Sequence, residues 1–91
     1  MVTAFILMKI QRERIAAAAQ EVLKLDGITE VYSVAGPYDV VAVARVPQNE
    51  GLAKLATEDL IQVEGILDTE TLIAFRQYSD YDLERMFTIG M

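Results

Sequence analysis

Four consecutive residues, Gly36-Pro37-Tyr38-Asp39, bring together groups that could bind a small zwitterion. The carboxylate of Asp39 could take the ammonium group of such a ligand, and the ring of Tyr38 could flank it. Main-chain N–H groups of the same segment could receive the ligand's carboxylate. Glycine, proline and aspartate together more often form only a turn, so on the residues alone a turn without a ligand is the stronger interpretation.

A second polar segment, Asp68-Thr69-Glu70-Thr71, leads into a run of apolar residues. The hydroxyl groups of Thr69 and Thr71 could hydrogen-bond a ligand. β-Branched residues also suit a strand, so the same two threonines have a purely structural explanation. Both interpretations stay open on the residues alone.

The chain lacks the residues that most catalytic and metal sites need, because it contains no His and no Cys. Ser33 and Ser79 therefore have no His to activate them, and no Gly-x-Ser-x-Gly elbow or phosphate-binding glycine loop is present. The acidic residues do not have the spacing of a calcium loop. We therefore predict no catalytic residue, no metal and no cofactor, and we expect that the protein is not an enzyme.

Length and charge restrict the function further. The 91 residues have room for one domain, and their net charge of −6 would be repelled by a phosphate backbone, so we expect no direct nucleic-acid binding. Charged or polar residues interrupt every apolar run, which excludes a membrane-spanning helix, and no basic leader marks a signal peptide. The absence of Cys is compatible with a reducing cytoplasm, where we expect the protein.

The periodicity of apolar residues predicts the order β-α-β-β-α-β. Residues 36–39 form a four-residue hairpin loop in which Pro37 suits a type I turn. This order is typical of an α+β ferredoxin-like sandwich, with a four-stranded antiparallel sheet and both helices on one face. We expect one domain over residues 1–78 and a C-terminal tail over 79–91, with a short helix through Asp80 to Phe87. The predicted strands are Val2–Ile10, Ile28–Ala35, Val40–Val46 and one within Ile66–Tyr78, and the predicted helices are Gln11–Leu25 and Glu50–Val63.

The first and third strands are apolar on both faces, although the helices cover only one face of such a sheet. The free face therefore needs a cover. We predict that the same face of a second copy covers it in a two-fold dimer. The alternative is that the terminal segment, Tyr81 to Phe87, folds back over it.

The strand order, the AGPYDVVAVAR hairpin and the run VEGILDTETLIAF resemble the effector-binding (RAM) domain of the Lrp/AsnC, or feast/famine, transcription regulators. The resemblance extends from Met1 to about Tyr78. It implies dimers that pair through their sheets, that assemble into octamer-like rings, and that bind amino acids at the interfaces between dimers. It also places Gly36, Tyr38 and Asp39 on the effector-contacting turn, with Thr69 and Thr71 at the hydroxyl positions of the last strand.

Full-length regulators of this family carry a helix-turn-helix domain before this segment, whereas here the first predicted strand begins at Val2. The resemblance therefore implies a stand-alone, oligomeric amino-acid-binding regulatory module without its own DNA-binding domain, for which a full-length regulator is a possible partner. One alternative is a small dimeric α+β barrel enzyme, of monooxygenase or isomerase type, with a pocket that holds Tyr32 or Tyr78. Another is an assembly partner that binds no ligand.

Overall fold

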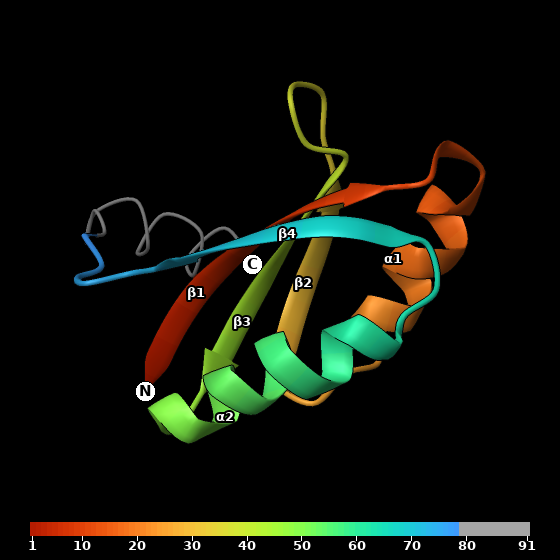
Figure 1. Ribbon diagram of the computed structural model, residues 1–91. Coiled ribbons are helices and arrows are strands. Elements are labelled where there is room, and N and C mark those ends of the chain that lie inside the picture. The colour runs from red at the N-terminus through yellow and green to blue at the C-terminus, as the bar shows by residue number, and fades with distance from the viewer. Residues whose placement is uncertain (79–91) are drawn as a thin grey trace, which may run out of the picture.

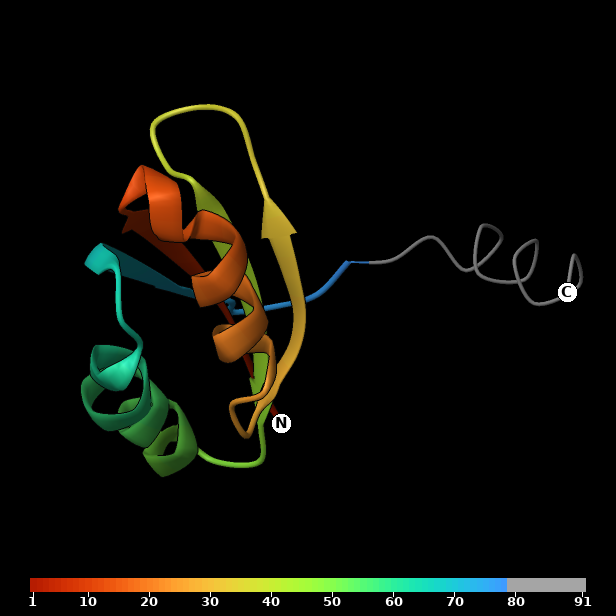
Figure 2. The same ribbon diagram turned by 90° about the vertical axis from the view of Figure 1, so that its right-hand side faces the viewer.

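Four strands form a single antiparallel sheet in the order β2-β3-β1-β4 (Figure 1). The computed structural model describes residues 1–78. Both helices lie on one face of the sheet, as the side view in Figure 2 shows, which confirms the predicted α+β ferredoxin-like fold. The strands are β1 (Val2–Ile10), β2 (Ile28–Ser33), β3 (Val40–Val46) and β4 (Ile66–Ile73).

The first helical segment is shorter than predicted. A single 3-10 turn, Arg12–Arg14, precedes α1 (Ile15–Leu23), so the chain reaches the helix from β1 without a loop. After α1 the chain turns back into β2 at Gly27, whose φ of +94° favours glycine. Beyond this, a Cβ at Gly27 would lie 2.7 Å from the side chain of Val46. The glycine therefore lets the turn pack closely against the end of β3.

The second helical segment changes its pitch. An α-helix, α2 (Asn49–Lys54), continues as a π-helical turn, Leu55–Asp59, and ends in a 3-10 turn, Leu60–Gln62. Leu55 and Leu60 are five residues apart, which in a regular α-helix would place them about 140° apart around the axis. The wider π turn brings both side chains to the sheet, where each is 1% exposed. The predicted helix over Glu50–Val63 is thus present from Asn49 to Gln62, but it is not regular.

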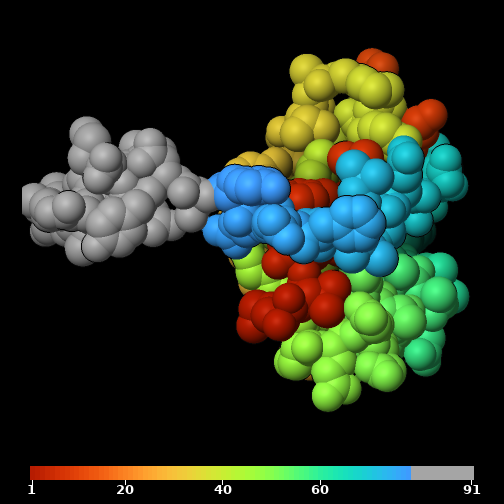
Figure 3. Space-filling view, turned by 90° about the vertical axis from the view of Figure 1, so that its left-hand side faces the viewer, coloured from red at the N-terminus to blue at the C-terminus, as the bar shows by residue number. Residues whose placement is uncertain are grey.

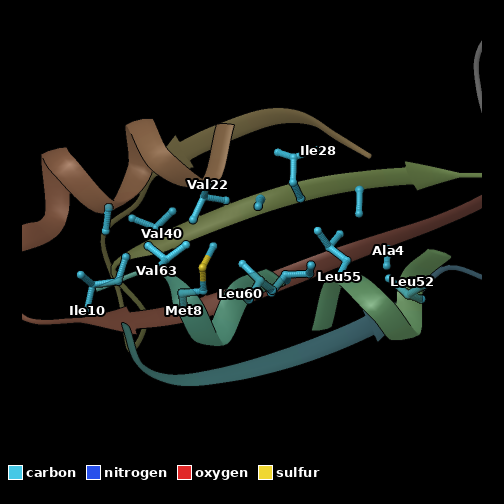
Figure 4. Close-up of a cluster of buried hydrophobic side chains, with 14 of the residues drawn as sticks. Ala4, Met8, Ile10, Val22, Ile28, Val40, Leu52, Leu55, Leu60 and Val63 are labelled. Carbon is cyan, nitrogen blue, oxygen red and sulfur yellow. The ribbon is translucent and has the colours of Figure 1, made fainter. Parts of the chain in front are cut away.

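The hydrophobic core lies between the sheet and the helices (Figure 4). Alternate residues of β1 and β3 point into it because successive side chains of a strand point to opposite faces. No polar side chain is buried in the part of the chain that the structure describes. The largest fully buried side chains are Ile6, Met8, Val22, Val40, Leu55 and Leu60.

The loop between β2 and β3 is longer than predicted, since β2 ends at Ser33 rather than Ala35. The N–H of Val34 donates to the carbonyl of Asp39 at 3.0 Å and closes the loop. A type I turn over 36–39 would use the N–H of Asp39, but this group donates instead to the carbonyl of Met8 on β1, at 2.9 Å. The loop is therefore anchored to β1 as well as to its own hairpin, and Figure 1 shows it projecting beyond the sheet.

Strand β4 ends at Ile73, five residues before the end of the predicted segment at Tyr78. Its last ladder bond is donated by the N–H of Ala74 to the carbonyl of Thr3, at 2.9 Å. Beyond this point β1 has almost reached its own first residue, so β4 has no neighbour with which to continue. The predicted terminal helix through Asp80 to Phe87 lies outside the described residues, and no described helix is long and apolar enough to cross a membrane.

The face of the sheet opposite the helices carries exposed apolar side chains. Phe5 is 41% exposed, Leu72 is 48% exposed and Tyr32 is 53% exposed. Phe5 lies opposite both Val43 of β3 and Leu72 of β4, so the apolar surface continues across three strands. The predicted apolar character of this free face is confirmed. Its pairing with a second copy stays a prediction.

Candidate functional site

Asp39 connects the hairpin loop to the end of β1. Its N–H donates to the carbonyl of Met8, and its Oδ2 accepts a hydrogen bond of 2.9 Å from the N–H of Ile10. Strand β1 is irregular here, because its register with β4 shifts between Lys9 and Ile10. The carboxylate thus satisfies a main-chain donor of a buried residue. Among the described residues only Oδ2 of Asp39 has a hydrogen-bond partner, so Oδ1 still has acceptor capacity.

Tyr38 lies beside Asp39 and contacts two other strands. Its hydroxyl donates a hydrogen bond to Oε2 of Glu70 on β4, and Nζ of Lys9 lies 5.7 Å from the centre of its ring. The bond to Glu70 holds the phenolic proton and the carboxylate repels a phenolate, so the pKa of Tyr38 is raised above its ordinary value. The tyrosine is therefore a neutral hydrogen-bond donor at neutral pH.

Gly36 gives the loop its conformation. Its φ is +134°, a region that side-chain-bearing residues rarely adopt. A Cβ added here would meet no atom within 4 Å, so the requirement for glycine comes from the backbone angle and not from lack of space. The open space beside the main chain leaves its polar groups accessible.

Thr69 and Thr71 lie on the other face of the sheet from Glu70. They pair with Met8 and Ile6, whose side chains point toward the helices, and paired residues of adjacent strands share a face. Thr69 is exposed and Thr71 is half-buried. Thr69 borders a surface hollow of about 290 Å³ together with Leu60, Ile61, Ile66, Leu67 and Asp68.

The structure therefore brings together Tyr38 and Asp39 at the loop end of the sheet, and separates them from the two threonines of the same chain. It adds Glu70 and Lys9, which sequence reasoning did not select. Alternation along β4 places Glu70 on the free face, opposite Leu7 of β1, and Lys9 also points there. This alternation is visible in the sequence, but the register between β1 and β4 was needed to place Glu70 and Lys9 on the same face.

The arrangement offers acidic oxygens from Asp39 and Glu70 and an ammonium group from Lys9, which are groups of the kind that pair with a zwitterion. It does not resemble the enclosed pocket that the enzyme alternative needs, because Tyr32 is 53% exposed and Tyr78 is 84% exposed. Within residues 1–78, no three acidic side chains gather as a metal site would require.

The sequence and the fold of this chain are both similar to those of known proteins. Residues 3–83 match the family model of the Lrp/AsnC ligand binding domain. The crystal structure of TTHA0845 from Thermus thermophilus is 41% identical with a TM-score of 0.82, and the match covers 88% of this chain and 100% of that one. The crystal structure of FFRP-DM1 is 31% identical with a TM-score of 0.78, over 82% of this chain and 100% of that one.

The HTH-type transcriptional regulator FL11 of Pyrococcus furiosus is 30% identical over 80 residues, which are 87% of this chain and 52% of that protein. The chain thus spans about half the length of the curated relatives that it matches.

Proposed function

Because this chain belongs to the Lrp/AsnC ligand-binding domain family, a family of regulatory effector-binding modules, we propose that it binds a free amino acid beside Asp39. The observation that carries the proposal is the unpartnered Oδ1 of Asp39, whose neighbour in sequence, Tyr38, contacts a second carboxylate and a lysine. In this arrangement the ligand's ammonium group meets Asp39 and Glu70, and its carboxylate meets Lys9 and the open main chain at Gly36. The proposed role is regulatory and not catalytic.

Two structures of the same fold support an amino acid as the ligand class. One is a complex of the transcriptional regulator NMB0573 of Neisseria meningitidis with L-Met. The other is a feast or famine regulatory protein of M. tuberculosis complexed with L-methionine. Both are under 25% identical to this chain, so they do not select the side chain that it would accept.

The placement of the threonines supports a site between copies of the chain. Thr69 and Thr71 point to the helix side of the sheet edge, whereas Tyr38 contacts Glu70 on the free face. A ligand can therefore meet the loop of one copy and the threonines only when a second copy supplies them. We propose that two copies pair through their free faces and that these dimers assemble into a larger ring, with a full-length regulator as a possible partner.

The test is calorimetric titration of the protein with each standard amino acid, followed by titration of variants with the ligand found. Asp39→Asn keeps an oxygen that can accept from the N–H of Ile10 but removes the charge, so we expect a folded protein with affinity lowered tenfold or more. Asp39→Ala would remove both the charge and the acceptor oxygen, so a loss of binding could not be separated from a loss of stability. Asp26→Asn, at the opposite end of the sheet, is the matched control and should bind like the wild type. A panel without any ligand, or unchanged binding by Asp39→Asn, would contradict the proposal.

A further inference from the structure

Residues 74–78 form an arm that leaves the sheet after β4. The root of the arm is held by the hydrogen bond from the N–H of Ala74 to the carbonyl of Thr3. Beyond the root, Phe75 is 104% exposed and Tyr78 is 84% exposed. Figure 2 shows the arm, in blue, extending away from the face that the helices cover. Two aromatic side chains thus project on the side where the sheet is bare.

A cleft of about 350 Å³ lies between the arm and the sheet. On the sheet side it is bordered by Met1, Thr3, Phe5 and Arg45, and the arm forms the other side. Figure 3 shows the arm in blue beside red atoms from the start of the chain. The volume is sufficient for an aromatic side chain, and Phe5 presents it with an apolar floor.

The free face alone is small for a stable dimer. Four strands about 4.8 Å apart and roughly seven residues long give a projected area on the order of 500 Å². Stable interfaces bury about 800 Å² on each partner. Two aromatic side chains of about 150–250 Å² each would close this difference. Within the described residues, the arm supplies two aromatic side chains on the side of the free face.

The arm also has the required reach. Its five residues can span up to about 17 Å, whereas two sheets that pack face to face are about 10 Å apart. Its single charged residue, Arg76, would come near Arg45 at the partner's cleft, but Arg45 is already paired with Glu30 at 3.5 Å.

We propose that two copies exchange their arms, with Phe75 of each copy filling the cleft beside Phe5 of the other. The contact occurs twice, as two-fold symmetry requires. This inference rests on the pairing of free faces proposed above, but not on the binding of an amino acid. The alternative is that the arm closes on the sheet of its own chain.

Disulfide trapping distinguishes these two arrangements, because the natural chain has no Cys. Thr3→Cys and Gln77→Cys are introduced into separate, differently tagged chains, which are refolded together and oxidised mildly. We expect a disulfide between the two tags, identified by mass spectrometry of unreduced peptides. Gln20→Cys on α1 replaces Gln77→Cys in the control and should give none. Equal yields from the two pairs would overturn the arm exchange.

A dilution series by analytical ultracentrifugation measures the contribution of the arm. Phe75→Ser and Tyr78→Ser should each weaken the dimer tenfold or more, whereas Gln77→Ser, on the same arm, should leave it close to the wild type. If Phe75→Ser dimerises like the wild type, the arm exchange is wrong and the pairing of faces stands. If the natural chain is monomeric at every concentration, both are wrong, and so is the site between copies, whereas calorimetry still tests binding beside Asp39 of a single copy.

Discussion

Two carboxylates beside the hairpin loop have different roles. Asp39 accepts from a main-chain N–H that is 29 residues away in sequence, so it stabilises the loop whether or not a ligand is present. Glu70 accepts from the Tyr38 hydroxyl on an exposed face, where a ligand can displace that contact. Removing the charge at Asp39 while keeping its acceptor is therefore the informative substitution, because a full truncation would leave the N–H of Ile10 unsatisfied at a cost of about 1–3 kcal/mol.

The Tyr38–Glu70 contact should be visible in the pH dependence of stability. The folded state holds the phenolic proton more tightly than the unfolded state, because the pKa of Tyr38 is raised by its hydrogen bond to Glu70. The resulting stabilisation is present below about pH 10 and is lost as the pH rises through the raised pKa. The absorbance of tyrosinate, taken as the difference between wild type and Tyr38→Phe, should therefore titrate above the pH of a free tyrosine.

Glu70→Gln provides the control for this titration. The neutral amide neither repels a phenolate nor binds the phenolic proton as strongly, so the difference titration should move back toward the ordinary pKa of tyrosine. An unchanged titration in Glu70→Gln would show that Glu70 does not hold Tyr38 in solution.

At the level of elements, the π turn in the second helical segment positions the core leucines. Leu60 is 1% exposed and its neighbour Ile61 is 73% exposed, so two consecutive apolar residues have opposite environments. We expect Leu60→Ala to lower the free energy of unfolding by about 2–5 kcal/mol. Ile61→Ala, the matched control, should change it by less than about 0.5 kcal/mol.

Urea denaturation of the two variants tests this difference. Similar losses from both would contradict the different burial of Leu60 and Ile61 in the structure. A large loss from Ile61→Ala alone would indicate instead that Ile61 is covered in the assembled protein, since that residue is exposed in a single copy.

For the whole molecule, charge and the apolar free face oppose each other. Each copy carries a net charge of −6, so two copies repel, while the exposed surface around Phe5 and Leu72 favours their association. Salt screens the repulsion without weakening apolar contacts. We expect the dissociation constant of the dimer to fall several-fold when sodium chloride is raised from about 0.05 M to about 0.5 M. Sedimentation equilibrium measures it, and a rise with salt would mean that ion pairs hold the dimer.

The elements and the character of their faces were determined by the sequence itself. The continuous apolar runs Val2–Ile10 and Val40–Val46 predicted both strands with the bounds that the structure has. Because successive side chains of a strand point to opposite faces, the same runs predicted an apolar free face. The missing His and Cys likewise restricted the chemistry without any knowledge of the fold.

Only the tertiary structure decided which polar groups meet. The contact of Tyr38 with Glu70 joins residues 32 apart, and it depends on a strand register that no local pattern contains. The same register puts Thr69 and Thr71 on the opposite face, since a shift of one residue would reverse every side chain of β4. Asp39 was expected to bind a ligand, and its structural task at Ile10 appeared only when the loop was placed against β1. Local periodicity thus specifies faces, whereas the pairing of distant segments specifies the candidate site.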